Sequence, residues 1–212
     1  MAQKIKKSVA TKNKLLDALW KLVVEGETKL SVKIITQKAK TAYGSFYRYF
    51  KNVDEMHREL IERRVNSLAE FAEESLMVIK SPLLRVYVGY YFALMMFRNK
   101  NVSAWVMKHP KFMNRTWPKF SEPTAEKFLL EAIETKDSAD FTKANMEHYK
   151  RVRRFIYWTY QEILVQHAEA KSKDEIFTDF MNSTNLLNLP KKIHQAFIKK
   201  TIKIVSQFEL PD

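Results

Sequence analysis

The sequence predicts an all-α protein, with an N-terminal head of three helices that contains a helix-turn-helix, followed by a larger helical body. Apolar residues make up 46% of the 212 residues, enough for a sizeable core, whereas only three glycines and six prolines are present. Strand-rich folds need many tight turns, which depend on Gly and Pro, so this composition favours long helices with few connections. No segment alternates with period two for long enough to predict a strand.

The first predicted helix covers residues 12–24. Leu15, Leu19 and Leu22 follow one another at intervals of four and three residues, which places them in one apolar stripe on a helix. Gly26 comes directly after this pattern, and glycine adopts the left-handed conformation that commonly ends helices. The helix should therefore stop just before Gly26.

The second and third predicted helices are short. Ser31 is a suitable N-cap for the second, whose apolar side carries Ile35 and Ala39. Phe46 and Phe50 lie four residues apart on the third. We expect these two phenylalanines to be buried against the first two helices.

The body is predicted to be helical as well. Asn52 and the acids that follow it indicate an N-cap, so a fourth helix should run from about residue 53 to 80 and stop before Pro82. Residues 83–97 are apolar on nearly every side and predict a buried central helix. Further expectations are a short helix between residues 101 and 109, a loop bounded by Pro118 and Pro123, helices over residues 124–135, 141–170 and 193–208, and a junction around residues 182–190.

Positive charge is concentrated at the N-terminal end. Residues 1–51 hold twelve Lys and Arg against three acids, whereas the whole chain has a net charge of +13. A basic head on a milder body is typical of polyanion binding, and nucleic acid is the first candidate. A merely solvated lysine-rich surface and an anionic membrane surface are the alternatives that charge alone leaves open.

The three helices of the head, with a four-residue turn before the third, form a helix-turn-helix. In that motif the third helix presents polar and aromatic side chains to the major groove of DNA while its apolar face packs on the other two helices. The Arg48 guanidinium can reach guanine or phosphate, and the Tyr47 phenol can donate to a phosphate oxygen. The residues expected to contact double-stranded DNA are Lys33, Thr41, Tyr43, Ser45, Tyr47, Arg48, Tyr49 and Lys51.

The run ITQKAKTAYGSFYRYFKNVDEM, residues 35–56, resembles the DNA-binding signature of the TetR family of bacterial repressors. The resemblance covers about residues 12–60, and the rest of the chain matches in length, helicity and layout. From Ala42 onward, about a dozen positions are similar to the TetR-like repressors of unsaturated fatty-acid synthesis. The residues on the family pattern are Leu16, Ala18, Gly26, Ser31, Ile35, Ala39, Gly44, Phe46, Tyr47, Tyr49 and Phe50.

Three positions depart from the family pattern. Lys40 replaces the usual glycine of the turn, so a lysine must adopt a left-handed or similar backbone at some energetic cost. Ala42 replaces the usual Ser or Thr cap of the recognition helix, which leaves Thr41 or the backbone to serve. Val53 replaces the usual lysine at the start of the fourth helix, which removes one expected phosphate contact.

The resemblance implies a DNA-binding domain over residues 1–51 and a domain for ligand binding and dimerisation over residues 52–212. Within the body, the apolar helix at residues 83–97 carries three tyrosines and two methionines, which suits an adaptable cavity, although any one such side chain is more often ordinary core. The basic residues scattered from Arg98 to Lys119 are either solvated or a port for an anionic head group. The residues expected to bind a ligand are Tyr87, Tyr91, Met95, Trp105, Phe128, Phe155 and Tyr157.

Several classes of protein are disfavoured. There is no cysteine, hence no disulfide or thiolate metal site. The longest apolar stretch, residues 86–97, is too short to span a bilayer, and the basic N-terminus lacks the apolar run of a signal peptide. No histidines four residues apart, HExxH motif, glycine-rich phosphate loop or nucleophile motif indicates a metal, a cofactor or an enzyme. We therefore expect a cytoplasmic protein without catalytic activity.

The sequence thus favours a ligand-responsive transcriptional regulator, most simply a repressor. Two chains would pair through their last two long helices and bind a pseudo-palindromic operator. The effector would be a small apolar or amphipathic molecule, for example a fatty acyl compound. The alternative is a helical lipid-carrying or membrane-surface protein with a basic head.

Overall fold

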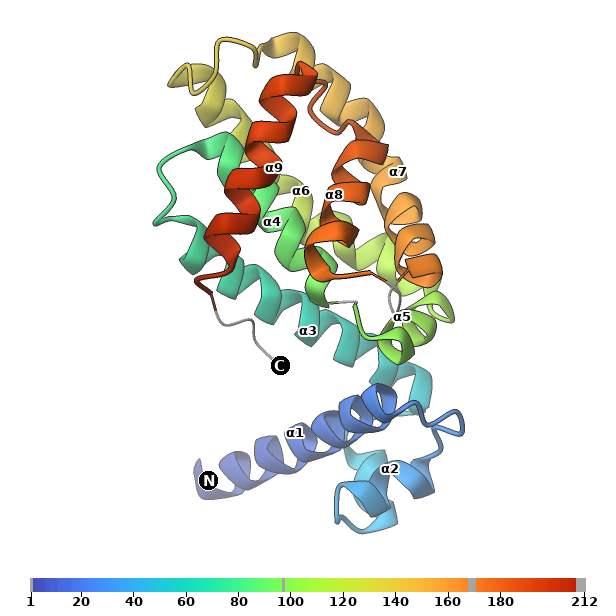
Figure 1. The fold of residues 1–212 in the computed structure, drawn as a ribbon. Coiled ribbons are helices and arrows are strands. Elements are labelled where there is room, and N and C mark those ends of the chain that lie inside the picture. Colours follow the sequence, from blue (N-terminus) through green and yellow to red (C-terminus); the bar gives the residue numbers. More distant parts are fainter. Residues whose placement is uncertain (1, 97, 168–170, 209–212) are drawn as a thin grey trace.

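The computed structural model describes residues 2–96, 98–167 and 171–208 (Figure 1), and within these ranges the chain is helical and has no strand. The predicted all-α class is therefore confirmed. The elements are α1 (Ala2–Glu25), α2 (Val32–Lys38), the 3-10 helix η1 (Tyr43–Arg48), α3 (Val53–Leu76), α4 (Pro82–Met96), α5 (Lys100–Met107), α6 (Pro110–Glu134), α7 (Lys143–His167), α8 (Lys173–Thr184) and α9 (Lys191–Val205).

The elements α1, α2 and η1 form a small head at the base of the molecule in Figure 1. Its core consists of large apolar side chains from all three elements, and each is at most 1% exposed: Leu15, Leu19, Ile35, Phe46 and Phe50. The predicted anchors Phe46 and Phe50 are thus confirmed as core residues.

Helix α3 connects the head to the body without a break. Its first turns pack against α1, where Lys12 Nζ lies 2.5 Å from Glu59 Oε1 and Arg63 lies 2.9 Å from Asp17 Oδ1. The later turns of α3 lie against α4 and α6. A displacement of α3 within the body would therefore move the head directly.

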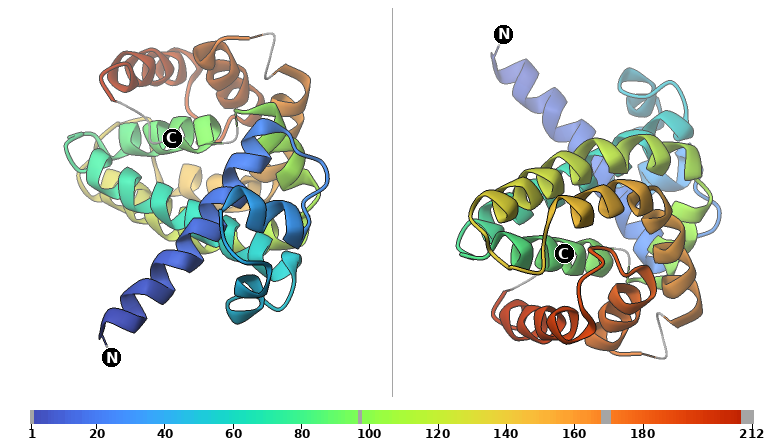
Figure 2. Two further views of the ribbon diagram at one scale, coloured as in Figure 1. Left: turned by 90° about the horizontal axis from the view of Figure 1, so that it is seen from below. Right: turned by 90° about the horizontal axis from the view of Figure 1, so that it is seen from above.

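The body surrounds α4, as the sequence predicts for a helix that is apolar on nearly every side. Figure 2 shows α4 between the pair α8 and α9 on one side and α3 and α6 on the other. All the α4 side chains described, apart from Gly89 and Met95, are buried. The central helix is confirmed.

Three predicted boundaries differ from the structure. Helix α1 begins at Ala2 instead of residue 12, since residues 2–11 contain no Gly or Pro to stop it. Helix α3 ends at Leu76 instead of residue 80. The predicted loop between Pro118 and Pro123 is wrong, because both prolines lie within α6. An internal proline removes one backbone hydrogen bond and is costly, but α6 packs along α3 and α4, and this tertiary packing outweighs the local preference.

Helix α8 is an element that the sequence analysis did not assign. Ser172 caps its first turn, where the Ser172 hydroxyl accepts from the Glu175 backbone N–H at 3.3 Å and the Glu175 carboxylate accepts from the Ser172 N–H at 2.8 Å. This capping box is legible in the sequence as Ser-Lys-Asp-Glu. It marks the start of a separate helix after the one predicted over residues 141–170.

Candidate nucleic-acid interface and ligand cavity

The turn between α2 and η1 sets the direction of the third element. The Ser31 hydroxyl caps α2 by accepting from the Ile34 N–H at 3.4 Å. Lys40 then adopts a left-handed backbone with φ of 52°, as its place at the position of a turn glycine predicted. This single residue reverses the chain, and the Thr41 N–H returns to the Thr36 carbonyl at 3.0 Å.

Element η1 begins without a side-chain cap. Ala42 offers no hydroxyl, and its backbone carbonyl instead accepts from the Ser45 N–H at 2.9 Å. The Thr41 hydroxyl does not substitute for the missing cap, because it is buried and has no hydrogen-bond partner among the described residues. The backbone therefore serves, which was one of the two expectations for this position.

Buried phenylalanines fix which face of η1 points outward. The rings of Phe46 and Phe50 lie 5.5 Å apart in the core of the head. On the opposite side, Tyr43 is 55% exposed and Tyr47 is 54% exposed, and their hydroxyls lie 3.3 Å from each other. A pair of accessible phenols on a fixed element can donate hydrogen bonds to an external partner.

Arg48, the last residue of η1, is exposed as well. One of its terminal nitrogens donates to the Ser45 hydroxyl at 3.1 Å, which holds the guanidinium close to η1. The outer part of η1 thus carries two contacting pairs, Tyr43 with Tyr47 and Ser45 with Arg48, and we call these four residues the η1 face.

The other residues predicted to bind DNA lie around the η1 face. Lys33 and Lys51 are exposed, on α2 and just after η1, and Lys40 in the turn is exposed as well. Among the described residues, no acid forms an ion pair with these three lysines. Tyr49 is only half exposed and packs against the core of the head.

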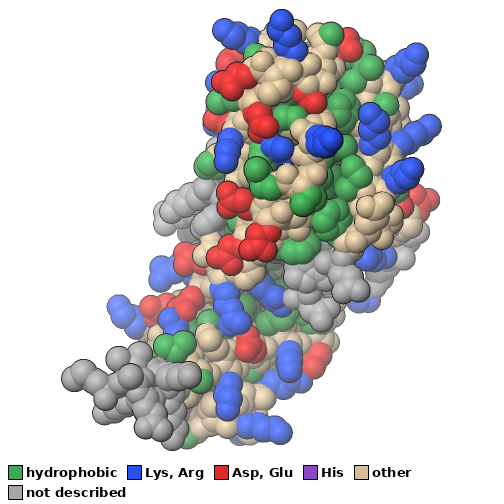
Figure 3. Space-filling view, turned by 90° about the vertical axis from the view of Figure 1, so that its left-hand side faces the viewer, with side chains coloured by type: hydrophobic (Ala, Val, Ile, Leu, Met, Phe, Trp, Pro, Cys, Tyr) green, Lys and Arg blue, Asp and Glu red, His purple; other side chains and the backbone are tan. Residues whose placement is uncertain are grey.

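Two other basic residues of the head form ion pairs within the chain. Lys38 Nζ lies 2.6 Å from a Glu25 oxygen, and Lys12 is paired with Glu59. Figure 3 shows lysine and arginine side chains spread over the head at the base of the molecule. Lys14 and Lys21 of α1 are exposed and, like Lys33, Lys40 and Lys51, form no ion pair with a described residue, so unpaired positive charge lies on α1 as well as near the η1 face.

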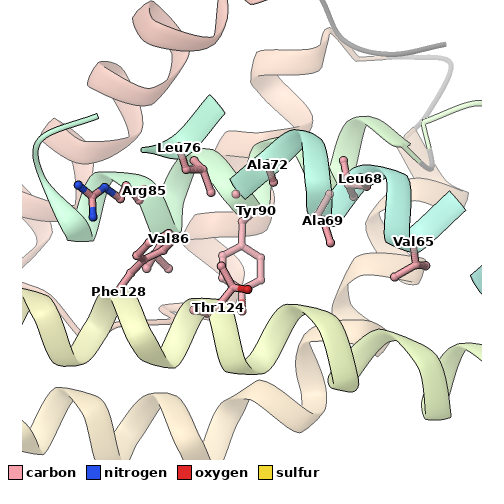
Figure 4. A pocket seen from close by; sticks show the side chains of 13 residues that line it. Val65, Leu68, Ala69, Ala72, Leu76, Arg85, Val86, Tyr90, Thr124 and Phe128 are labelled. Atoms are coloured by element: carbon pink, nitrogen blue, oxygen red, sulfur yellow. The ribbon is translucent and has the colours of Figure 1, made fainter. Parts of the chain in front are cut away.

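A cavity lies in the body between α3, α4 and α6 (Figure 4). Its empty volume is about 620 Å³, including its opening to solvent. Small side chains from the three helices leave this space: Ala69, Ala72, Gly89, Ala93 and Ala125. Larger apolar residues complete the wall: Val65, Leu68, Leu76, Val86, Tyr90 and Phe128.

Polar groups are few in this wall. Thr124 and the Tyr90 hydroxyl are present, and the latter lies 3.4 Å from the Tyr149 hydroxyl of α7. Arg85 lies at one end of the cavity in Figure 4 and is 7% exposed. Its guanidinium donates to Glu131 at 2.8 Å and to the Ile79 carbonyl at 2.7 Å.

The residues predicted to bind a ligand are dispersed over the body. Phe128 lines the cavity. Tyr87 faces α9, with its hydroxyl 2.7 Å from His194 Nδ1, and Tyr91 faces α8, with its hydroxyl 3.1 Å from Asp174.

Met95, Trp105 and Phe155 are not among the described residues that line the cavity. Met95 is half-buried near the end of α4, and Trp105 packs against His57 below the body. Phe155 is 62% exposed on α7, and the side chain of Tyr157 lies outside those described. Sequence reasoning missed Arg85, Gly89 and the alanines, whose small size on otherwise apolar helix faces was the available signal.

A second group of contacts joins the head to the body. His57 of α3 and His109, the residue before α6, are hydrogen-bonded at 2.8 Å between Nδ1 and Nε2. Nearby, the Asn101 amide of α5 donates to the Val24 carbonyl at the end of α1, at 2.9 Å. Burial lowers the pKa of His57 to about 4 and also lowers that of His109, so both rings are neutral at pH 7.

Two further properties of the described residues bear on the site. None of their helices combines the length and apolarity needed to cross a bilayer. Nor do they contain a group of three or more His, Asp or Glu residues placed to hold a metal ion.

Comparison with known proteins shows the fold. No protein-family model matches the sequence, and no curated protein matches it either. Among solved structures, the chain is similar to RolR in its complex with the ligand resorcinol, with a TM-score of 0.64 and 16% sequence identity over 98% of each chain. This likeness over the full length shows that the head and the body together share the fold of RolR.

Proposed function

We propose that this protein is a ligand-responsive transcriptional repressor that binds double-stranded DNA as a homodimer. Residues 1–51 would contact the operator, and residues 52–212 would bind the effector and form the dimer. The observation that carries the proposal is the η1 face, where two exposed phenols and a guanidinium are held in place by Phe46 and Phe50 from behind.

The chemistry of the η1 face suits a duplex groove. Tyr47 and Tyr43 can donate to phosphate oxygens, and Arg48 can form a two-pronged contact with a guanine edge or a phosphate. Lys33, Lys40 and Lys51 are exposed, have no acid partner among the described residues and can neutralise phosphates. Phosphate contacts would hold the register, and base-edge contacts from η1 would select the sequence.

In this proposal the protein is a dimer, because two η1 faces that bind together give a higher affinity for DNA than one. Two heads separated by about 34–36 Å would enter successive major grooves on one side of the duplex. We propose that α7 and α9, the last two long helices, supply the pairing surface. Exposed Phe155 on α7 is an apolar side chain available to it.

The effector site in this proposal is the cavity between α3, α4 and α6. A molecule bound there would contact α3, which also carries the head, and α6, which begins next to His109. RolR, which has the same fold, binds the small molecule resorcinol. The ligand can shift the spacing of the heads only by as much as its affinity differs between the two arrangements.

A gel-shift assay on DNA that flanks the protein's own gene tests the DNA-binding function. The wild-type chain should retard this DNA at low salt and prefer it to a scrambled duplex. Replacing Tyr47 and Arg48 by Ala should weaken binding by about 1–3 kcal/mol for each base that the variant no longer reads. Absence of a retarded band at low salt would refute the proposal.

The same preparation can be tested against lipid. If the basic head docks on membranes, liposomes with anionic lipid should float the protein as strongly as DNA retards it, and the Tyr47 and Arg48 variants should bind them equally well. Strong flotation together with no preference for any DNA sequence would favour the membrane-surface alternative.

A further inference from the structure

We propose that the cavity between α3, α4 and α6 selects uncharged apolar molecules and discriminates against carboxylates of the same shape. This inference rests on the proposed function, in which the cavity holds the effector. It concerns the charge of that effector, which neither the fold nor the η1 face determines.

The argument begins with Arg85. Among the described residues that line the cavity, Arg85 is the one with a formal charge. An isolated buried guanidinium would attract an anion strongly, because a charge in an apolar site must be paired. A cavity with such a group would therefore favour fatty acids or aromatic acids.

Arg85 is not isolated, however. Its charge is matched by Glu131 at 2.8 Å, and a further N–H donates to the Ile79 carbonyl. The same guanidinium lies 5.3 Å from the centre of the Phe128 ring, which occupies part of its remaining surface. An incoming carboxylate would gain attraction from Arg85 but would be repelled by Glu131.

Desolvation decides between the two kinds of ligand. A carboxylate loses its hydration shell when it enters an apolar space. The free energy lost is recovered only if the carboxylate meets a positive charge that has no other partner. Among the described lining residues none other than Arg85 is charged, and the ion pair between Arg85 and Glu131 leaves no net charge. The desolvation free energy of an alcohol or phenol is much smaller, because one hydroxyl needs only one hydrogen bond.

The shape of the wall indicates the body of the ligand. The lining residues of α3 run from Val65 to Leu76, a distance of roughly 16 Å at 1.5 Å per residue. The lining residues of α3 and α4 include the small residues Ala69, Ala72, Gly89 and Ala93. The space is therefore long and lined by small residues, which suits an extended chain or a flat ring system with one uncharged polar group.

A matched pair of ligands tests the inference. Decanol and decanoate have the same chain and differ in charge at neutral pH, as do 1-naphthol and 1-naphthoate. Binding is measured by isothermal titration calorimetry on the full chain, with thermal shift as a second readout. The wild type should bind each uncharged member at least about tenfold more tightly than its carboxylate, which corresponds to about 1.4 kcal/mol.

The variant Glu131→Gln removes the negative charge that compensates Arg85 and keeps the size of the side chain. It leaves the Arg85 charge uncompensated, so decanoate should gain about tenfold in affinity while decanol changes less than about threefold. Arg85→Gln is the matched control, because it removes the attracting charge and should bring no gain for decanoate. The decanol arm also reports whether each variant still has an intact cavity.

Substitutions at Gly89 test whether the compounds bind in this cavity. A Cβ at Gly89 would lie 3.6 Å from Leu76 Cδ1, an ordinary contact, so Gly89→Ala should fold normally. Gly89→Leu extends into the cavity and should remove binding of all four compounds.

The outcomes separate this inference from the proposed function. If wild-type protein binds decanoate as well as decanol, and Gly89→Leu removes both, the charge selectivity is refuted and the cavity remains the effector site. If none of the four compounds binds, or if Gly89→Leu leaves binding unchanged, the cavity is not the effector site and both proposals fail.

Discussion

The Nδ1 atom of His57 lies 2.8 Å from the Nε2 atom of His109, and this hydrogen bond joins the helix that supports the head to the start of a helix that lines the cavity. The His57 ring is 7% exposed and also packs edge-on against Trp105. Two neutral imidazoles can share this bond as one donor and one acceptor. The junction between head and body therefore depends on the protonation state of a buried pair.

The stability of the protein should fall as pH falls below about 6.5. The pKa of His57 is lowered by burial to about 4, from an unperturbed value of 6.5. The folded state thus stays unprotonated while the unfolded state binds a proton, so the stabilisation present above pH 6.5 is lost between pH 6.5 and 4. Neighbouring charges act both ways, since Asp54 raises the pKa of both histidines and Lys108 lowers that of His109.

The magnitude can be measured by urea denaturation across this pH range. We expect His57→Gln to remove about 2–3 kcal/mol of the pH dependence. The matched control is His148→Gln, because His148 is only partly buried and its ring contacts the Asn185 carbonyl. An unchanged pH profile in His57→Gln would show that the pair does not titrate as described.

Gly26 should be intolerant of substitution. It has φ of +82°, and a Cβ there would lie 2.8 Å from Asn101 Nδ2, the group that binds the Val24 carbonyl. Gly26→Ala should destabilise the protein by about 1–2 kcal/mol through backbone strain and disruption of this hydrogen bond. Gly44→Ala is the control, since its Cβ would meet nothing within 4 Å. Equal melting temperatures for the two variants would contradict this role of Gly26 at the junction.

Lys40→Gly should stabilise the head. Lys40 has φ of 52°, a conformation that costs a non-glycine residue about 1 kcal/mol or more, whereas glycine adopts it freely. The larger unfolded-state entropy of glycine offsets part of the gain, so we expect a net increase of about 0.5–1 kcal/mol in unfolding free energy. The opposite sign is expected for Lys33→Gly within α2, where glycine is unfavourable. Thermal denaturation of the two variants side by side distinguishes these effects.

Substitutions at the neighbouring residues Phe46 and Tyr47 should affect different properties, the first the stability of the fold and the second the affinity for DNA. Phe46→Ala removes a fully buried ring and should cost about 3–5 kcal/mol of stability. Tyr47→Ala removes a side chain that is 54% exposed and should change stability by less than about 0.5 kcal/mol. The effect of Tyr47→Ala should appear instead in DNA affinity, measured by fluorescence anisotropy. A large drop in stability in Tyr47→Ala would mean that its ring supports the fold.

The sequence predicted the head more completely than the body, for a physical reason. In the head, each key feature is local: Ser31 caps α2, Lys40 replaces a turn glycine, and Phe46 and Phe50 lie one helical turn apart. Local patterns of this kind determine which side of a short element is buried. The η1 face could be predicted from them directly, although its 3-10 geometry could not.

In the body, the orientation of α4 could not be predicted from the sequence. This helix is apolar on nearly every side, so periodicity gives no inner face. The structure directs Tyr87 and Tyr91 toward α9 and α8, whereas Tyr90 and Gly89 face the cavity. The orientation depends on which helices pack against each side, and those contacts are distant in sequence.

The most direct test of the central claim is photocrosslinking from the η1 face to DNA. Benzoylphenylalanine at position 47 should crosslink to the duplex that the protein retards, and at position 78, where Val78 is 74% exposed on the body, it should not. Crosslinking from position 47 that is competed by excess unlabelled duplex is the predicted result. Crosslinking from position 78 alone, or from neither position while the DNA is bound, would show that another surface contacts the duplex.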